Sequence, residues 1–437
     1  MLSWTSINII LPFAVFLGLY GQYIYNTQPG TNYTPRPLED FPGYRCRRIN
    51  HPLLGSCEDL WLDSVNRKLY AACSNPAARK AWSPGANTYD LPARKAAGGG
   101  TDHITVLDVD QPGADGLFGV HALNFQAKGH VQTLDLHGFD ARQIDNGRLR
   151  FWLINHRPPL DPATGEELTD ATQVGANSTI EVYDLDLGLA PKHLEHVTTI
   201  ASHVIISPNN LVMVDEDGTG EGGFLFTNDH GAKVGEGRDP RMHFGDGSVG
   251  YCRTDTGKCH IAAADGCSLP NGITRDPSSG LVYVAQSAAA SVTVYRLAYD
   301  NRLFRIGEIG TSIAIDNLSI DSEGNVFGGA IPVPEQFMKA FHDPYETDAP
   351  STVLMIRNKN RPDGSGVLEQ YEEARVVDVE AEVKEQFEVV RVVEDAEAKV
   401  LPTTTTVVHD PISGRLFLGG VSSPFMGVCE RVERTYN

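Results

Sequence analysis

The chain has 437 residues, with 36 basic and 56 acidic side chains, which gives a formal net charge of -20 at pH 7. A field of this sign repels nucleic acid and anionic lipid headgroups and attracts cations such as calcium. The charge therefore argues against nucleic acid as a partner.

The N-terminal segment from Ile7 to Gly21 is mostly apolar, and a polar stretch rich in Pro and Gly follows it. About 15 residues is longer than many signal-peptide cores and shorter than the roughly 20 that span a bilayer. We expect residues 1–40 to form an uncleaved secretory anchor with its stem; a cleaved signal peptide is the alternative. Residues 41–437 then form one lumenal or extracellular domain, held at the membrane by this segment or secreted.

A short pattern recurs six times along the rest of the chain. Each copy has a polar residue just ahead of an apolar strand, then an Asp-rich turn and a second apolar strand. The copies start at Glu58, His137, Asn209, Asn271, Asp316 and Thr405, and their second strands contain Leu69, Phe151, Phe224, Val282, Val326 and Leu416. The intervals between the starts leave room for one four-stranded sheet each, with loop insertions.

Six such sheets arranged radially predict an all-β fold, a six-bladed β-propeller. The first strand of every blade lines the central channel, so the residues that start these strands converge on the axis although they are far apart in sequence. The pattern therefore predicts a central cluster of carboxylate and amide oxygens with one imidazole.

The cysteines and sequons indicate an oxidising, glycosylating compartment. Cys46 precedes the first repeat and Cys429 follows the last, so a disulfide between them would close the ring, and the chain-entropy model values such a closure at roughly 5 kcal/mol. Two further pairs are placed to bridge within single blades, and they leave Cys267 as the odd thiol: Cys57 with Cys73, and Cys252 with Cys259. The sequons that predict glycosylation lie at Asn32 and Asn177.

The converging residues have the chemistry of a calcium site. Calcium takes about six to eight oxygen ligands and mixes carboxylates with amide and backbone carbonyls. Two carboxylates neutralise the ion and three amides fill the coordination sphere: Glu58, Asn209, Asn271, Asp316 and Asn317. Any one of them alone is more typical of a turn or strand end. Their equivalent positions in the repeat favour the metal site.

Two histidines are candidates for proton transfer. His137 starts the first strand of its blade, and His156 ends the second. If these strands are hairpin neighbours, the two rings lie at the same rim, and a hydrogen bond between them would raise the basicity of the inner ring. From position alone, two strand-end histidines without a catalytic role are an equal alternative.

Several short segments, in the same order along the chain, resemble the serum paraoxonase/arylesterase family: Glu58-Asp59-Leu60, His137-Gly138-Phe139, Asn155-His156, Asn209-Asn210, Asn228-Asp229-His230, Asn271-Gly272-Ile273 and Asp316-Asn317-Leu318. The resemblance spans about Cys46 to Cys429. It implies a six-bladed propeller with two calcium ions, one catalytic and one structural. It also implies hydrolysis of lactones and aryl esters, with organophosphate triesters as promiscuous substrates.

The resemblance assigns roles to individual residues. The catalytic calcium would be held by the five residues named above and would polarise the ester carbonyl, while His137, oriented by His156, activates water. The structural calcium would use Asp59, the Phe139 carbonyl and Asn210. The family usually has Asp at the position of Asn210, so the resemblance implies a weaker second ion here.

The segment between His230 and Asn271 also departs from the family, which has an aromatic stretch there that contacts membranes or lipoproteins. The resemblance therefore does not extend to lipoprotein association. Two rival functions stay open. One is a calcium-stabilised propeller with a non-enzymatic binding role, against which the histidine pair argues. The other is a gluconolactonase-like or strictosidine-synthase-like propeller enzyme, against which the Glu58-Asp59 dipeptide and the ring-closing cysteines argue.

Overall fold

The computed structural model describes residues 33–126, 133–145, 147–189, 192–214, 220–359 and 386–432. The expected anchor and the sequon at Asn32 lie outside these ranges. Within them, no helix has both the length and the apolar character needed to cross a bilayer.

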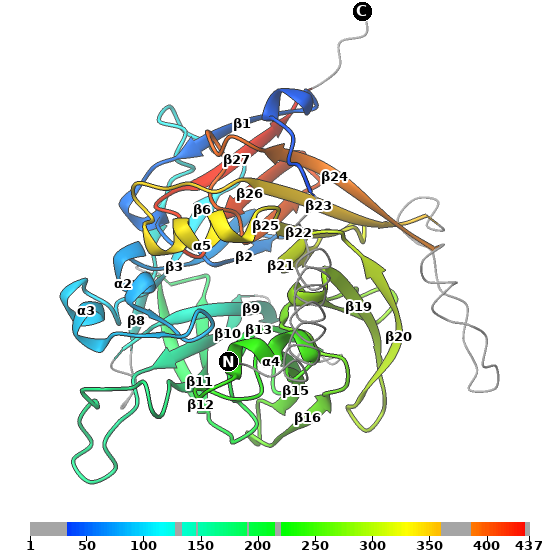
Figure 1. The fold of residues 1–437 in the computed structure, drawn as a ribbon. Helices are drawn as coiled ribbons and strands as arrows, with labels where there is room; N and C mark the ends of the chain where they lie inside the picture. Colours follow the sequence, from blue (N-terminus) through cyan, green and yellow to red (C-terminus); the bar gives the residue numbers. More distant parts are fainter. Residues whose placement is uncertain are drawn as a thin grey trace, which may run out of the picture.

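The described chain forms six sheets arranged radially (Figure 1), which confirms the predicted six-bladed propeller. In each blade the first strand of the repeat is innermost. The first three blades consist of β2 (Asp59–Asp63), β3 (Lys68–Cys73), β6 (His103–Asp108) and β7 (His121–Ala122); β9 (Leu136–Asp145), β10 (Arg148–Arg157), β11 (Asn177–Asp186) and β12 (His193–Ile200); and β13 (Pro208–Met213), β14 (Gly223–Asn228), β15 (Ser248–Arg253) and β16 (Cys259–Ala263).

The other three blades follow the same antiparallel order, and the last one takes its outer strand from the N-terminal side of the domain. They consist of β17 (Pro270–Arg275), β18 (Leu281–Gln286), β19 (Ser291–Leu297) and β20 (Leu303–Gly310); β21 (Ala314–Ile320), β22 (Val326–Ile331), β23 (Ser351–Asn358) and β24 (Phe387–Asp395); and β25 (Thr406–Asp410), β26 (Arg415–Gly419), β27 (Met426–Arg431) and β1 (Tyr44–Ile49).

The second blade departs from the expected four strands. A short fifth strand, β8 (Asn124–Gln126), pairs in parallel with β12. An outer strand presents unpaired main-chain groups, and a neighbouring loop of the same chain satisfies some of them here.

Ring closure occurs where the sequence predicts it. Strand β1 pairs antiparallel with β27 in the last blade (blue beside red in Figure 1), and Cys46 lies opposite Cys429 in that register. A disulfide joins the two. The other expected pairs, Cys57 with Cys73 and Cys252 with Cys259, are also bonded, and Cys267 is buried and free.

Two glycines allow the inner strands to approach one another around the axis. A Cβ at Gly138 would lie 2.5 Å from the Asn209 carbonyl oxygen, and one at Gly272 would lie 2.4 Å from the Leu318 nitrogen. Separations this short are not accessible to a residue with a side chain. The glycines that follow His137 and Asn271 therefore let the site-bearing strands lie side by side.

The hydrophobic core is divided among the blade interfaces. Between the first and second blades, for example, Tyr70 packs edge-to-face on Phe151, with ring centroids 5.3 Å apart. Equivalent clusters occupy each of the other interfaces. Each blade therefore buries both faces against its neighbours.

Short helices and one hairpin interrupt the repeat and gather at the end of the channel where the inner strands start. They are α2 (Pro76–Ala81), α3 (Leu91–Ala96), α4 (Arg238–Arg241), α5 (Pro334–His342), the hairpin of β4 (Trp82–Ser83) and β5 (Thr88–Tyr89), and the 3-10 turns η2 (Pro52–Leu54), η3 (Met242–Phe244) and η4 (Ser287–Ala289). The 3-10 turn η1 (Leu38–Asp40) lies elsewhere, against the outer strand β24.

At the closing interface, a partly buried ion pair joins the first and last blades. Arg67 donates two hydrogen bonds to Asp410, with nitrogen to oxygen distances of 2.8 and 2.6 Å. Burial raises the pKa of the Asp410 carboxyl, but the bonds from Arg67 and Ser413 outweigh burial and lower it to about 2.

This ion pair predicts an acid-dependent contribution to stability. The folded-state pKa lies below the ordinary value of about 3.9, so the contribution is complete above about pH 4 and is lost as the pH falls toward 2. Asp410→Asn should lower the free energy of unfolding by about 2 kcal/mol at neutral pH. Urea unfolding of both proteins at several pH values should show this difference disappear near pH 2. A difference that does not change with pH would contradict the assignment.

Candidate functional site

A cavity of about 480 Å³ opens at the end of the channel where the inner strands start. Its floor is polar and its walls are largely apolar. The floor includes Glu58, His137, Asn209, Asn271 and Asp316, and the walls include Leu269, Ile331, Phe337, Met338 and Phe341. Five residues from five blades therefore meet at one place, as the repeat predicts. We call this space the central cavity.

Three of the predicted calcium ligands have an oxygen that no hydrogen bond satisfies. Glu58 Oε2, Asn209 Oδ1 and Asn271 Oδ1 are all buried and unpartnered. Buried polar atoms are nearly always hydrogen-bonded, so three orphaned acceptors on one cavity floor need an explanation. Oxygen ligands of a hard cation have this character.

The other two predicted ligands have hydrogen-bond partners. Asp316 accepts a hydrogen bond from the Asn271 side chain. The Asn317 amide nitrogen donates to Glu58 Oε1 at 2.7 Å and to the Glu58 carbonyl oxygen at 2.9 Å. Asn317 thus binds Glu58 through its NH2 group and does not line the cavity, whereas Asp316 does.

The electrostatics of the floor also favour a cation. Burial, and then the charge of Asp316, raise the pKa of Glu58 to about 8. Burial raises the pKa of Asp316 to about 7. Both carboxylates are removed from water and lie near other carboxylates, Asp316 in the case of Glu58, and Asp59 and Asp229 in the case of Asp316. A divalent cation beside them would favour their charged forms and oppose these shifts.

The predicted ligands of the structural calcium lie one layer deeper. Asp59, Phe139 and Asn210 are buried on neighbouring inner strands, and the Phe139 main-chain nitrogen donates to Asp59 Oδ2 at 2.9 Å. Among the residues that the structure describes, no three His, Cys, Asp or Glu side chains converge closely enough to hold an ion by themselves. A cation at either place would therefore depend on amide or carbonyl oxygens.

The two histidines lie on adjacent strands, β9 and β10, as the sequence predicts. Their rings pack edge-to-face with centroids 5.1 Å apart. The hydrogen bond that we expected between them is not seen in the described structure. Instead, His156 Nδ1 bonds to Ser178 Oγ at 2.9 Å, His137 Nε2 lies 3.6 Å from Glu58 Oε1, and His137 Nδ1 has no partner.

Burial keeps both imidazoles neutral. It lowers the pKa of His137 well below its usual value, with His156 and Arg79 contributing, and it lowers the pKa of His156 to about 3. The sequence predicts that the pair raises the pKa of the inner ring, His137. In the fold, the cost of charging a buried ring outweighs that effect.

The insertion that carries α2 and α3 supports the histidines from behind. Arg94 forms a two-pronged ion pair with Asp135, at 2.7 and 2.6 Å, and the Asp135 carbonyl accepts from the His156 main-chain nitrogen at 2.8 Å. Asp102, paired with Arg79, accepts from the Leu136 nitrogen at 2.7 Å. Two buried Arg–Asp pairs therefore fix the strand ends that carry both rings.

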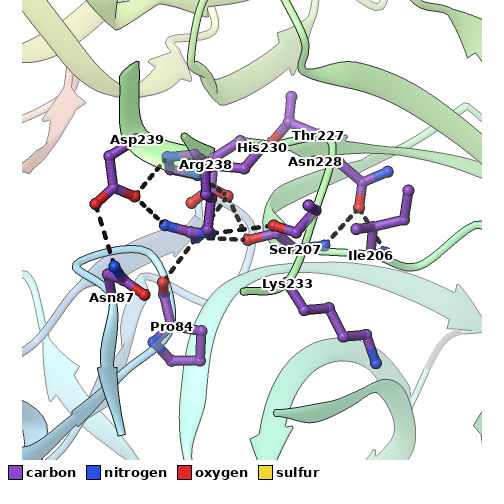
Figure 2. A network of polar contacts seen from close by, with 12 residues as sticks. Pro84, Asn87, Ile206, Ser207, Thr227, Asn228, His230, Lys233, Arg238 and Asp239 are labelled. Atoms are coloured by element: carbon purple, nitrogen blue, oxygen red, sulfur yellow. Dashed lines mark hydrogen bonds and ion pairs between the residues drawn. The ribbon is translucent and has the colours of Figure 1, made fainter. Parts of the chain in front are cut away.

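Figure 2 shows a second polar network, and its residues Asp229, His230 and Asp239 line the central cavity. Arg238, 1% exposed, donates to the Pro84 and Ala232 carbonyl oxygens at 2.8 and 3.0 Å and to Asp239 at 2.8 Å. Its Nη2 also lies 3.9 Å from Asp229 Oδ1. Arg238 thereby joins the β4–β5 hairpin to the segment between β14 and β15. We call these residues the rim network.

Asp229 is the buried carboxylate of the rim network. It accepts from His230 Nδ1 at 2.8 Å and from the Ser207 hydroxyl. Burial raises the pKa of Asp229, but His230 and Arg238 outweigh burial and hold it below its usual range. His230 and Asp239 both line the central cavity. The rim network therefore sets the shape of the wall beside the histidine pair.

Sequence reasoning missed both supporting networks. Arg79, Arg94 and Arg238 lie in insertions outside the repeat, and no motif distinguishes them from solvated arginines. Asp229 and His230 appeared only as part of the family resemblance.

The rim network predicts that Arg238 matters for stability. Arg238→Met removes the guanidinium and leaves Asp229 buried with fewer partners, so we expect a loss of about 3 kcal/mol in the free energy of unfolding. Arg241→Met, on the same helix but half exposed, is the matched control and should change stability by no more than about 0.5 kcal/mol. Chemical denaturation measures both. Equal losses would show that Arg238 does not hold the rim.

Comparison with known proteins gives one family. The family model described as Arylesterase matches residues 173–389, which include Asn209, Asn271 and Asp316. No match was found among curated proteins. A gluconolactonase structure from Xanthomonas campestris is 12% identical and matches 92% of this chain and 94% of its own at a TM-score of 0.45. A luciferin-regenerating enzyme is 12% identical and matches 90% of this chain and 96% of its own at 0.45. Values this low carry no argument about activity. The arylesterase match, on a six-bladed propeller, confirms the resemblance of this chain to the paraoxonase/arylesterase family.

Proposed function

We propose that this protein is a calcium-dependent hydrolase of carboxylic esters that acts on lactones and aryl esters. The observation that carries the proposal is the floor of the central cavity, which combines three residues that have an orphaned oxygen with the imidazole of His137. An oxygen cradle beside a neutral imidazole is the arrangement that metal-assisted hydrolysis requires.

The residues of the floor fit calcium. Glu58, Asn209, Asn271 and Asp316 would hold it, and the Asn317 NH2 group would position the Glu58 carboxylate. When bound, the ion polarises the carbonyl of the ester and stabilises the oxyanion that forms. Carboxylate and amide ligands in this ratio neutralise a divalent charge without excess.

His137 is the proposed general base. Its low pKa keeps the ring uncharged at neutral pH, so a ring nitrogen is able to accept a proton. As water attacks the carbonyl carbon, the proton moves to His137; when the carbon–oxygen bond to the leaving group breaks, His137 returns it to that oxygen. His156 packs against the ring and fixes its orientation.

The apolar walls suit the hydrocarbon part of such substrates. Phe337 and Met338 from α5 line the cavity together with Leu269 and Ile331. An acyl chain or aryl group placed there would lose contact with water, while the ester group rests on the polar floor. The same cavity would admit organophosphate triesters as secondary substrates.

The first test is turnover by the purified propeller. We expect the protein to hydrolyse phenyl acetate and a medium-chain lactone. EGTA should abolish this activity. Calcium added in excess over EGTA should restore it, whereas the same amount of calcium added as its EGTA complex should not. Product release followed by absorbance or pH-stat measures this. The absence of turnover on both substrates with calcium present would instead favour a calcium-stabilised binding propeller.

The second test separates the base from the metal site. His137→Gln should lower kcat by about 100-fold or more, because a general base contributes about that factor, and should leave bound calcium unchanged. Glu58→Ala should lose both calcium and activity. His121→Gln, an exposed histidine on β7, is the control and should behave like the wild type. Similar mild effects from His137→Gln and Glu58→Ala would contradict these roles.

A further inference from the structure

The second, deeper place expected for a cation differs in its chemistry from the cavity floor. Asp59 supplies its one carboxylate, and both oxygens already accept main-chain hydrogen bonds, Oδ1 from Leu60 and Oδ2 from Phe139, each at 2.9 Å. The Thr406 hydroxyl also approaches Oδ1, at 3.4 Å. No side-chain oxygen of Asp59 or Asn210 is among the orphaned buried atoms of the described chain.

Asn210 is oriented by the main chain. Its Oδ1 accepts from the Leu211 nitrogen at 2.6 Å. Since a main-chain N–H only donates, this bond identifies the oxygen end of the amide, and the NH2 end must face the other way. There Asn210 Nδ2 donates to Asn317 Oδ1 at 2.7 Å.

The chain of bonds continues to the cavity floor. Asn317 uses its own NH2 group to hold the Glu58 carboxylate and carbonyl oxygens. Leu211, Asn210, Asn317 and Glu58 thus form one directed series in which every donor meets an acceptor. We call it the amide relay. A cation beside Asn210 would meet N–H hydrogens where it needs an oxygen.

Close packing reinforces this arrangement. A Cβ at Gly138 would lie 2.6 Å from Asn210 Cα and 2.9 Å from its Cγ, so the inner strands already touch at this point. The deeper place also has less negative charge than a divalent ion requires, because Asn210 is neutral.

From this we infer that the centre of the propeller holds one divalent cation, at the cavity floor. The hydrogen bonds of the amide relay stabilise the inner strands at the place where a second ion would otherwise bind. The inference rests on the proposed calcium site at Glu58 and adds that Asn210 makes the deeper place unsuited to an ion. Its chemistry predicts the reverse change: a carboxylate at position 210 would place an oxygen against Asn317 Oδ1, where Asn210 now donates, and would need a cation to compensate it.

The experiment counts calcium. Wild type and Asn210→Asp are equilibrated by dialysis at about 1 mM free calcium, a level that fills even weak protein sites, and bound metal is measured by mass spectrometry against protein concentration. We expect one ion per wild-type chain and two per Asn210→Asp chain. Asn301→Asp, the same charge change in a surface turn between β19 and β20, should keep one.

A stability readout accompanies the count. Calcium should raise the Tm of Asn210→Asp by more than it raises the Tm of the wild type, because the introduced carboxylate is destabilising until the second ion binds. Activity is not needed for either measurement.

The outcomes separate this inference from the proposed function. Two ions in the wild type would overturn the inference and leave the proposed function standing. One ion in both the wild type and Asn210→Asp would overturn the role assigned to Asn210. No ion in the wild type would overturn the proposed metal site and this inference together. If Asn210→Asp does not fold, the wild-type count alone decides between one ion and two.

Discussion

The structure depends on a concentration of buried negative charge where the six inner strands meet. Glu58, Asp59 and Asp316 lie together out of contact with water, and burial and mutual repulsion raise the pKa of each. Such an arrangement is costly unless hydrogen bonds or a cation compensate it. Main-chain N–H groups donate to Asp59, and the Asn317 side chain donates to one oxygen of Glu58. The orphaned oxygens of Glu58, Asn209 and Asn271 belong to residues that line the central cavity.

Rigid surroundings keep that charge in place. The ring is closed by strand pairing, by a disulfide and by the Arg67–Asp410 ion pair at the same interface. Buried arginines act at three positions around the cavity, each with a carboxylate partner: Arg79, Arg94 and Arg238. Because each arginine is paired with a carboxylate outside the cavity floor, it stabilises its segment without neutralising the floor. The protein thus places positive charge beside the site and keeps it out of the site.

Much of the fold was predictable because it repeats. Six copies of one pattern placed the inner strands, and two cysteines at the ends of the repeat identified the closing blade. The floor residues followed from their shared position in each copy. What lay outside the repeat was not predictable in the same way. The parallel strand β8, the helices over the channel and the three buried arginines come from insertions that differ between blades, so no periodicity locates them.

The sequence by itself determined which side chains converge on the axis, because the start of an inner strand is defined by the repeat whatever the loops do. It also determined the chemistry of those side chains, including a neutral amide at Asn210. Only the tertiary structure decided how each group is used. Burial of the ring, and not its contact with His156, controls the charge of His137. Desolvation depends on all the groups that surround the ring, which only the assembled fold defines. The direction of the amide relay depends on one main-chain N–H at Leu211, whose position exists only when the strands are assembled.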